Sequence, residues 1–455
     1  LETAPYGPSA IPLRNNPAVC TRPFTVDQIH EVVKAYGAAA LMLKKAGVDG
    51  IEMHAYGGYL FDQFMTSAWN HRTDEYGGSL ENRMRFVVEC LHEVRKTCGA
   101  DFPVTAKVTV DHRINKPGYR TIEEGIEMCR ILEREGIDAL HLDTGCYERY
   151  YCQIPSVYEE KGMELDVIRK IRAAVKVPLM GQGKLNDPAV AESVIEEGAL
   201  DVIALGHQML ADPDWPTKVK EGRWKEINYC IGCNECMLMA VMGKHRPCAV
   251  NPLSGHELDY PFTRAEKTKK LLVVGGGPAG LAAALEARHR GIEVTLWERN
   301  GYLGGNLAAA GAPKFKSDVK TYLENLIYRV ENSGVNIVMN KTATKEDILA
   351  EGVQDVILAT GSDPIVIRLP KAENSSVKVY TSNELLLADS LPEGDVVVIG
   401  GGLVGCEVAL HLDGRANGGK VTMIEALDGI LKTVSHFGTN DQSLRDHIAE
   451  SNIEV

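Results

Sequence analysis

The feature that most restricts the fold of this chain is a pair of glycine-rich turns, each lying between an apolar strand and a helix. The first, in LLVVGGGPAGLAAALEA, begins just after Lys270, and the second, in VVVIGGGLVGCEVAL, begins just after Asp395. Strand, GxGxxG turn and helix in this order predict a dinucleotide-binding unit, because the glycines let the backbone approach a pyrophosphate at the helix N-terminus. Two such units in tandem predict a duplicated, Rossmann-like architecture.

Each turn is followed by an acidic residue where an adenosine ribose is expected. Glu298 ends the strand after the first turn, and Glu425 ends the strand after the second. A carboxylate at this place binds ribose hydroxyls and repels a 2′-phosphate, so the second unit is predicted to prefer NADH to NADPH. The glycines that carry the prediction are Gly275, Gly277 and Gly280 in the first unit and Gly400, Gly402 and Gly405 in the second.

A cysteine cluster lies in the connector from 229 to about 265. The CxxCxxC run with a further cysteine downstream supplies the four thiolates that a [4Fe-4S] cluster takes from its protein. Zinc is the main alternative, although a four-cysteine zinc site usually has two separated CxxC knuckles. Buried structural cysteines are another alternative, but they leave the regular spacing unexplained. We therefore expect a [4Fe-4S] cluster bound by Cys230, Cys233, Cys236 and Cys248.

Residues 1 to about 228 alternate short apolar strands with amphipathic helices, which is typical of a parallel α/β fold. Thr25 with Gln28, and Thr121 with Glu124, predict capping boxes at two helix starts. Five strands do not close an eight-stranded barrel, so we expect an incomplete (β/α)8 TIM barrel whose first three strands lie upstream. The predicted strands are 49–55, 103–110, 139–145, 178–183 and 201–206.

Composition restricts the partners of the chain. Its formal net charge of -13 argues against nucleic acid and anionic membranes, because both attract clustered Lys and Arg. No apolar run reaches the ~18 residues of a membrane span, and no secretory leader opens the sequence. We therefore expect a cytoplasmic enzyme with a small-molecule substrate, and a homo-oligomer is compatible with the sequence. Because it begins at Leu1 and stops at Val455 inside a nucleotide-binding unit, we expect both ends to be truncated.

The segment IEMHAYGGYLFDQFMTSAWNHRTDEYGGSLENRMRF, residues 51 to 86, resembles the active-site stretch of the Old Yellow Enzyme family. With CIGCNEC and the two nucleotide units, the whole chain resembles the multidomain branch of that family, which includes 2,4-dienoyl-CoA reductases, 2-enoate reductases, trimethylamine dehydrogenases and bile-acid-inducible NADH:flavin oxidoreductases. The resemblance implies an FMN-binding barrel at 1–228, a [4Fe-4S] connector at 229–265, the first part of an FAD domain at 266–392 and an NADH domain at 393–455. The Ala359-Thr360-Gly361 turn resembles the one that returns beneath the dinucleotide in disulfide-reductase-like flavoproteins.

The same resemblance assigns two catalytic residues. Tyr59 matches the tyrosine that protonates one carbon of a polarised C=C while hydride attacks the other, and a phenol with a pKa near ~10 is neutral at pH 7. His54 matches the first of two positions that hydrogen-bond the substrate carbonyl. The second position, often His or Asn, is Gly57 here, which weakens the implied carbonyl clamp unless Tyr56 compensates.

Flavin contacts follow in the same way. Lys107 matches a cation near the flavin pyrimidine, where positive charge stabilises reduced flavin and Arg is commoner. Gly183 with Lys184, and Gly206 with His207, match the strand ends where barrels bind a phosphate. His207 stands where Arg is usual, which implies a weaker or pH-sensitive contact. Further expectations are bracing ion pairs from Arg72, Asp74, Arg83 and Arg85, and a substrate pocket shaped by Tyr147, Tyr150 and Tyr151.

The leading hypothesis is an NADH-dependent reductase, or reversible desaturase, of an α,β-unsaturated carbonyl compound such as an enoate, a dienoyl-CoA or a 3-oxo-Δ4 steroid or bile acid. Electrons would pass from NADH through FAD and the [4Fe-4S] cluster to FMN. One alternative is an amine dehydrogenase that sends electrons to an external acceptor and binds only ADP at the first nucleotide unit. Another is a non-catalytic electron-transfer subunit.

Overall fold

The computed structural model describes residues 4–14, 16–366, 375–415, 418–432 and 437–455, and it divides the chain into two compact units. The first unit contains residues 1–155 and 160–205, and the second contains residues 156–159 and 206–455. No helix in these described ranges combines the length and the apolar composition that a membrane crossing requires.

The first unit is built on a five-stranded parallel sheet with the order β5-β6-β7-β8-β9. All five strands lie within the ranges predicted from the sequence, apart from one additional residue at the end of β6. Alternate positions of β6 are fully buried, because every second side chain points into the layer between sheet and helices. The strands are β5 (Ile51–Ala55), β6 (Val104–Asp111), β7 (Ala139–Thr144), β8 (Leu179–Gly181) and β9 (Val202–Ile203).

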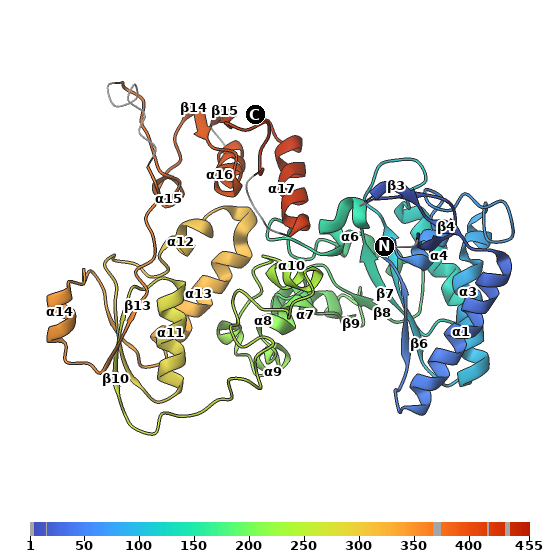
Figure 1. Ribbon diagram of the computed structural model, residues 1–455, viewed down its shortest axis with the longest axis horizontal. Coiled ribbons are helices and arrows are strands. Elements are labelled where there is room, and N and C mark those ends of the chain that lie inside the picture. Colours follow the sequence, from blue (N-terminus) through green and yellow to red (C-terminus); the bar gives the residue numbers. More distant parts are fainter. Residues whose placement is uncertain (1–3, 15, 367–374, 416–417, 433–436) are drawn as a thin grey trace. The chain divides into compact units, whose positions relative to one another are not determined.

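Helices follow the strands in the order of a β/α barrel. The long helices α1 and α3 lie side by side next to the sheet (Figure 1), and their apolar faces join its main core. Short strands β1 (Tyr6–Gly7), β2 (Pro12–Leu13), β3 (Asn16–Cys20) and β4 (Arg22–Pro23) precede them. The helices are α1 (Val26–Lys45), α2 (Leu60–Met65), α3 (Leu80–Cys98), α4 (Ile122–Arg134), α5 (Tyr150–Gln153), α6 (Leu165–Arg172) and α7 (Pro188–Glu196), with the 3-10 turn η1 (Tyr147–Arg149).

The two predicted capping boxes have different outcomes. The box of Thr25 and Gln28 is confirmed, since each side chain bonds the backbone of the other. The box of Thr121 and Glu124 is wrong, because Thr121 is the N-cap residue of α4 but makes no side-chain cap bond. The Glu124 carboxylate instead pairs with Arg83 at 2.8 Å. A long-range ion pair therefore takes the place of the local hydrogen bonds that were expected.

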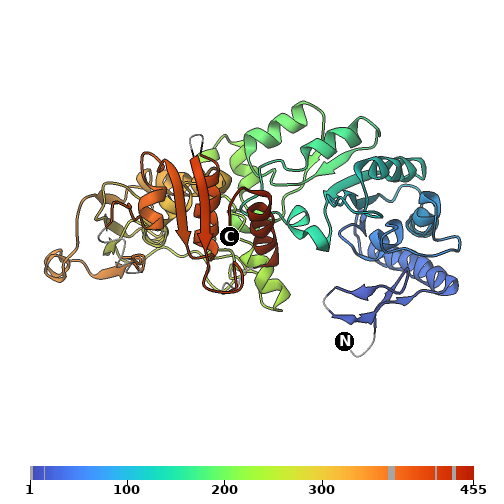
Figure 2. The same cartoon turned by 90° about the horizontal axis from the view of Figure 1, so that it is seen from above.

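The second unit contains two separate parallel sheets. The first has the order β12-β11-β10-β13, and the second pairs β14 with β15, which Figure 2 shows as neighbouring strands. The strands are β10 (Lys270–Val274), β11 (Glu293–Trp297), β12 (Asn336–Val338), β13 (Asp355–Leu358), β14 (Gly394–Ile399) and β15 (Gly418–Ile424). This is the predicted pattern of two strand–turn–helix units, each beginning a parallel sheet.

Helices of this unit both precede and follow the strands of the two sheets. Helix α11 follows the first glycine-rich turn and α16 follows the second. They are α8 (His207–Ala211), α9 (Trp215–Lys220), α10 (Glu235–Val241), α11 (Pro278–His289), α12 (Asn306–Ala310), α13 (Ser317–Glu331), α14 (Lys345–Ala350), α15 (Ser382–Leu386), α16 (Leu403–Asp413) and α17 (Gly438–Glu450), with 3-10 turns η2 (Trp224–Glu226) and η3 (Lys314–Lys316).

Candidate functional site

The candidate site of the first unit begins at a double-glycine turn after β5. Gly57 and Gly58 have φ values of 69° and 82°, a left-handed conformation that side chains with a Cβ rarely adopt. The turn reverses the chain so that Tyr59 becomes the N-cap residue of α2, and its side chain stays 40% exposed. The sequence YGGY therefore places a phenol at the end of the strand that carries His54.

Aromatic side chains gather around this phenol. The His54 ring lies 4.5 Å from the Tyr56 ring and 4.7 Å from the Tyr59 ring, measured between centroids. The Tyr147 hydroxyl donates a hydrogen bond of 2.6 Å to the Tyr59 hydroxyl. Burial, with Lys107 nearby, lowers the pKa of His54 below its ordinary value, so this imidazole is neutral at pH 7 and has one N–H to donate.

A fully buried ionic network fixes the Gly57–Gly58 turn. Asp62 on α2 accepts a hydrogen bond of 2.7 Å from the backbone N–H of Gly58 and pairs with Arg120 at 2.5 Å. His112 lies 3.3 Å from the same carboxylate. Burial opposes ionisation, but Arg120 and His112 hold the pKa of Asp62 well below its usual range. The position of Tyr59 is therefore anchored by a charged pair inside the unit.

Lys107 on β6 lies in a second polar cluster. Its Nζ donates to Oε1 of Gln182 at 2.8 Å, contacts Oδ2 of Asp143 at 3.1 Å and lies 4.3 Å from the centre of the Tyr56 ring. Burial lowers the pKa of Lys107, but the carboxylate of Asp143 and other neighbours more than offset this, so the pKa is raised overall. The lysine stays charged, and its charge is largely matched by Asp143.

A second buried carboxyl group, that of Glu164, completes this cluster. Thr144 donates to Oε1 of Glu164 at 3.2 Å, while Oε2 has no hydrogen-bond partner among the described residues. Burial and then the neighbouring Asp143 raise the pKa of Glu164 well above its usual range, and burial also raises that of Asp143. Two buried carboxyl groups beside one lysine are stable when they share one proton.

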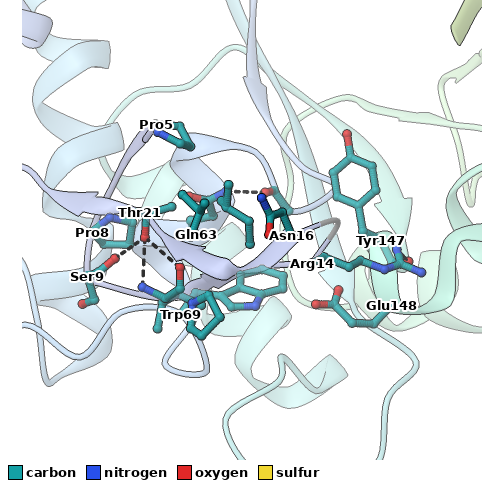
Figure 3. A pocket seen from close by; sticks show the side chains of 15 residues that line it. Pro5, Pro8, Ser9, Arg14, Asn16, Thr21, Gln63, Trp69, Tyr147 and Glu148 are labelled. Carbon is teal, nitrogen blue, oxygen red and sulfur yellow. Dashed lines mark hydrogen bonds between the residues drawn. The ribbon is translucent and has the colours of Figure 1, made fainter. Parts of the chain in front are cut away.

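A pocket of about 450 Å³ adjoins the tyrosines within the first unit. Figure 3 shows Tyr147 and Glu148 at one end and Ser9 and Thr21 at the other. The guanidinium of Arg14 donates to the backbone carbonyl of Tyr147, which fixes that end. The wall is mostly apolar and is lined by Pro5, Pro8, Ile11, Pro12, Leu13, Val19, Gly58 and Trp69. An apolar wall with a few polar groups at its ends is typical of a small-molecule pocket.

The two glycine-rich turns of the second unit have matching geometry. A Cβ built on Gly280 would overlap the carbonyl of Gly275, and one built on Gly405 would overlap that of Gly400. By contrast, a Cβ on Gly277 or Gly402 would meet nothing within 4 Å. In each turn the last glycine thus lets the helix pack on the strand, and the middle one leaves an open cradle for a pyrophosphate.

The predicted ribose carboxylates are held in the same way in both turns. The backbone N–H of Gly276 donates to Glu298 at 2.7 Å, and that of Gly401 donates to Glu425 at 2.6 Å. Hydrogen bonds from the backbone of Leu427 and Gly401 lower the pKa of Glu425. Each turn therefore has an open cradle with a fixed carboxylate next to it, an arrangement that suits an adenine dinucleotide.

The four clustered cysteines are free thiols of intermediate exposure. Burial raises the pKa of Cys230 to about 12 and that of Cys233 to about 11, and Cys248 lies close enough to act on both. In the described part of the chain, no three His, Cys, Asp or Glu side chains converge on one point that could hold a single metal ion. Four thiols on one loop are the donors that a [4Fe-4S] cluster takes from its protein, and the binding of such a cluster here stays a prediction.

Contacts within the second unit shape this cysteine loop. Asn234 has a left-handed φ of 59°, and its side chain donates to Thr439 and Asn440 of α17 at 2.9 and 2.8 Å. The backbone N–H of Gly232 points to Sγ of Cys230 at 3.5 Å. N–H···S bonds of this kind adjust the potential of bound clusters.

The predicted phosphate residues lie at the expected ends of strands. Gly183 and Lys184 follow β8 with φ values of 92° and 57°, in the first unit. Gly206 and His207 begin α8 in the second unit, where burial and then Arg246 lower the pKa of His207. Their joint role in binding a phosphate stays a prediction.

Other expectations have mixed outcomes. Arg72 pairs with Asp74 at 2.5 Å as predicted, and Arg83 pairs with Glu124, whereas Arg85 bonds the backbone of Glu75. Sequence reasoning missed Asp62, Asp143, Glu164 and Gln153, since their partners lie far away along the chain. Of the three tyrosines expected to shape a substrate pocket, Tyr147 lines this pocket, whereas Tyr150 and Tyr151 are not among its lining residues. The hydrogen bond from Tyr147 to Tyr59 was not foreseen.

Comparisons with known proteins match both parts of the chain. The model of the NADH:flavin oxidoreductase / NADH oxidase family matches residues 3–226, and that of the pyridine nucleotide-disulphide oxidoreductases matches residues 269–455. The cinnamate reductase of Clostridium sporogenes is 42% identical, over 98% of this chain and 69% of that protein. The NADH oxidase of Thermoanaerobacter brockii is 38% identical, over 96% of this chain and 68% of that protein.

Solved structures of similar proteins support the same family. A 2-naphthoyl-CoA reductase in complex with 2-naphthoyl-CoA superposes with a TM-score of 0.90 at 30% identity, over 99% of this chain and 68% of that one. A dimethylamine dehydrogenase of Hyphomicrobium is a more distant relative, 31% identical over 74% of this chain. The chain therefore belongs to the NADH:flavin oxidoreductase / NADH oxidase family, in its multidomain, Old Yellow Enzyme-type branch.

Proposed function

We propose that the protein reduces the C=C bond of an α,β-unsaturated acid or thioester at the expense of NADH. The observation that carries the proposal is the exposed Tyr59 phenol, bonded to Tyr147 and packed against a neutral His54. Relatives named for cinnamate and for 2-naphthoyl-CoA support an acyl group conjugated to an aromatic ring. The apolar pocket beside Tyr147 suits the ring of such a substrate.

The residues of the site divide the chemistry among them. Bound FMN would supply a hydride equivalent to one carbon of the double bond. The His54 N–H donates to the carbonyl oxygen and polarises the conjugated system. The Tyr59 hydroxyl gives its proton to the other carbon, so that the π bond breaks and two C–H bonds form. Because Tyr147 donates to the Tyr59 oxygen, it leaves the Tyr59 proton free to point at the substrate and stabilises the phenolate that remains.

The cofactors are assigned by the residues that fit them. Lys107, with Gln182 beside it, would face the pyrimidine of FMN, and Gly183, Lys184, Gly206 and His207 would bind its phosphate. The first nucleotide turn would hold FAD and the second NADH. Cys230, Cys233, Cys236 and Cys248 would hold a [4Fe-4S] cluster that passes electrons between the flavins. This assignment keeps the four-part division at residues 228, 265 and 392 as a prediction.

Anaerobic stopped-flow spectroscopy tests the proposed function. In wild-type protein, NADH should bleach the flavins, and cinnamate should then reoxidise them. Tyr59→Phe should leave bleaching unchanged and slow reoxidation by about 10²–10⁴-fold, the usual contribution of a general acid. Tyr147→Phe should slow reoxidation less, by about tenfold, because one hydrogen bond is lost. If neither enoates nor their thioesters reoxidise wild-type protein, the proposal fails.

The amine dehydrogenase alternative is less well supported. It requires ADP without FAD at the first turn and sends electrons outward without NADH, whereas the second turn keeps the open cradle and the fixed carboxylate of a dinucleotide site. Acid extraction of the purified protein separates the two cases, since our proposal expects equal amounts of FAD and FMN. The electron-transfer subunit alternative predicts that Tyr59→Phe leaves turnover unchanged.

A further inference from the structure

Gly57 lacks a side chain at a point where one would reach the candidate site, and another residue fills the space. Gly57 lies three positions after His54 and two before Tyr59, and its backbone N–H donates to Oγ1 of Thr109 at 2.8 Å. A Cβ built on Gly57 would overlap Nε2 of Gln153 and lie 2.9 Å from its Cδ. The carboxamide of Gln153, from the end of α5, therefore lies where a side chain of residue 57 would begin.

This carboxamide has unused hydrogen-bonding capacity. Gln153 is only 8% exposed, and its Oε1 has no hydrogen-bond partner among the described residues. A buried amide without a partner is destabilising and rare, so such groups in native proteins generally serve a ligand or a water molecule. The amide carries two N–H donors as well as its oxygen, and a half-turn about its last bond exchanges them.

We propose that Gln153 is a catalytic residue that donates a hydrogen bond to the carbonyl oxygen of the substrate, as the second donor beside His54. The inference rests on the proposed function and identifies the substrate as one with a carbonyl next to the reacting double bond. A neutral amide suits this task, because it polarises the carbonyl without repelling a nearby Lys107. It also explains why a glycine is required at residue 57, since any larger side chain would displace the amide.

Ligand binding tests the inference separately from turnover. In the FMN-loaded full chain, the dissociation constant of cinnamate is measured from the change in flavin absorbance, with propenylbenzene as a matched ligand that lacks the carboxylate. Gln153→Leu, which keeps the volume and removes the donors, should weaken cinnamate binding about tenfold and leave propenylbenzene binding unchanged. Equal losses for both ligands, or no loss for cinnamate, would overturn the inference.

A second variant restores the amide from the other side of the site. Gln153→Ala should weaken binding in the same way, and adding Gly57→Asn should bring cinnamate affinity back to within about threefold of wild type. Asparagine is chosen because it tolerates the left-handed φ of 69° better than other side chains do. A double variant that binds no better than Gln153→Ala would contradict the inference. Absence of turnover in wild type would refute only the proposed function. The comparison of cinnamate affinity between wild type and the Gln153 variants would still test the inference, because binding is measured without turnover.

Discussion

At the scale of single residues, the sequence located the residues that belong to a short motif. It missed the residues whose role depends on contacts with distant parts of the chain. Tyr59 and His54 lie in one short segment, so the sequence was enough to place them at the end of β5. Glu164 and Gln153 acquire their roles from neighbours on other strands and loops, and no local pattern marks them. For the same reason, Glu124 was assigned to a capping box although Arg83 takes its carboxylate.

Glu164 gives a pH-dependent prediction at this scale. Its folded-state pKa is raised above the ~4.3 of an unfolded chain, so its stabilising contribution is present below that value and is lost as pH rises toward the folded pKa. Glu164→Gln cannot ionise and should escape this loss. Between pH ~4.3 and the folded-state pKa of Glu164, the free energy of unfolding of the variant, measured with urea, should rise relative to that of wild type by about 1.4 kcal/mol for each pH unit.

The control for Glu164 is an exposed glutamate. Glu346→Gln on α14 should change the free energy of unfolding little over the same pH range, since surface charges contribute little. If the difference in free energy of unfolding between Glu164→Gln and wild type does not vary with pH, Glu164 and Asp143 do not share a proton.

At the scale of elements, the turn before α2 is stabilised by a buried pair. Asp62→Asn should lower the free energy of unfolding by about 3–5 kcal/mol, because the buried Arg120 would keep only the more distant carboxylate of Glu124, 4.0 Å from its Nε, as a countercharge. Asp166→Asn is the matched control: its carboxylate is 53% exposed in its pair with Arg113, so the loss of this pair should cost less than about 1 kcal/mol. Chemical denaturation of both variants measures the difference, and equal losses would contradict the anchoring role of Asp62.

The first glycine-rich turn allows fold and binding to be separated. Gly280→Ala should destabilise the unit, because its Cβ would overlap the carbonyl of Gly275. Gly277→Ala should reduce FAD content and leave the melting temperature of the FAD-free protein nearly unchanged, because only the open cradle is filled. Calorimetry and flavin extraction on both variants check this, and a Gly277→Ala protein that retains full FAD would argue against the cradle.

At the scale of the whole molecule, the order of parts was predictable because each part carries its own motif. The five strands of the first unit and the two strand–turn–helix pairs of the second follow from apolar runs and glycines. Contacts across long stretches of sequence, such as the bonds of Asn234 to Thr439 and Asn440, were not predictable. They depend on how α17 folds back within its unit.

The electron route gives the prediction that belongs to the whole molecule. Cys233→Ala should remove the iron-sulfur absorbance and stop electrons from reaching FMN, while NADH still reduces FAD. Cys20→Ala, at an exposed cysteine outside the cluster, should behave like wild type. Rapid-scan spectroscopy with iron analysis measures both, and FMN reduction at the normal rate in Cys233→Ala would exclude the cluster as the link.

The carboxylates of Glu298 and Glu425, each tied to a backbone amide, have one more consequence. A nucleotide arriving at either turn meets an acceptor that is already oriented, so little rotational freedom remains to be lost when the complex forms. At the second turn, where we propose that NADH binds, a rigid acceptor favours rapid capture and release over slow adjustment, which suits a carrier that must visit and leave in every catalytic cycle.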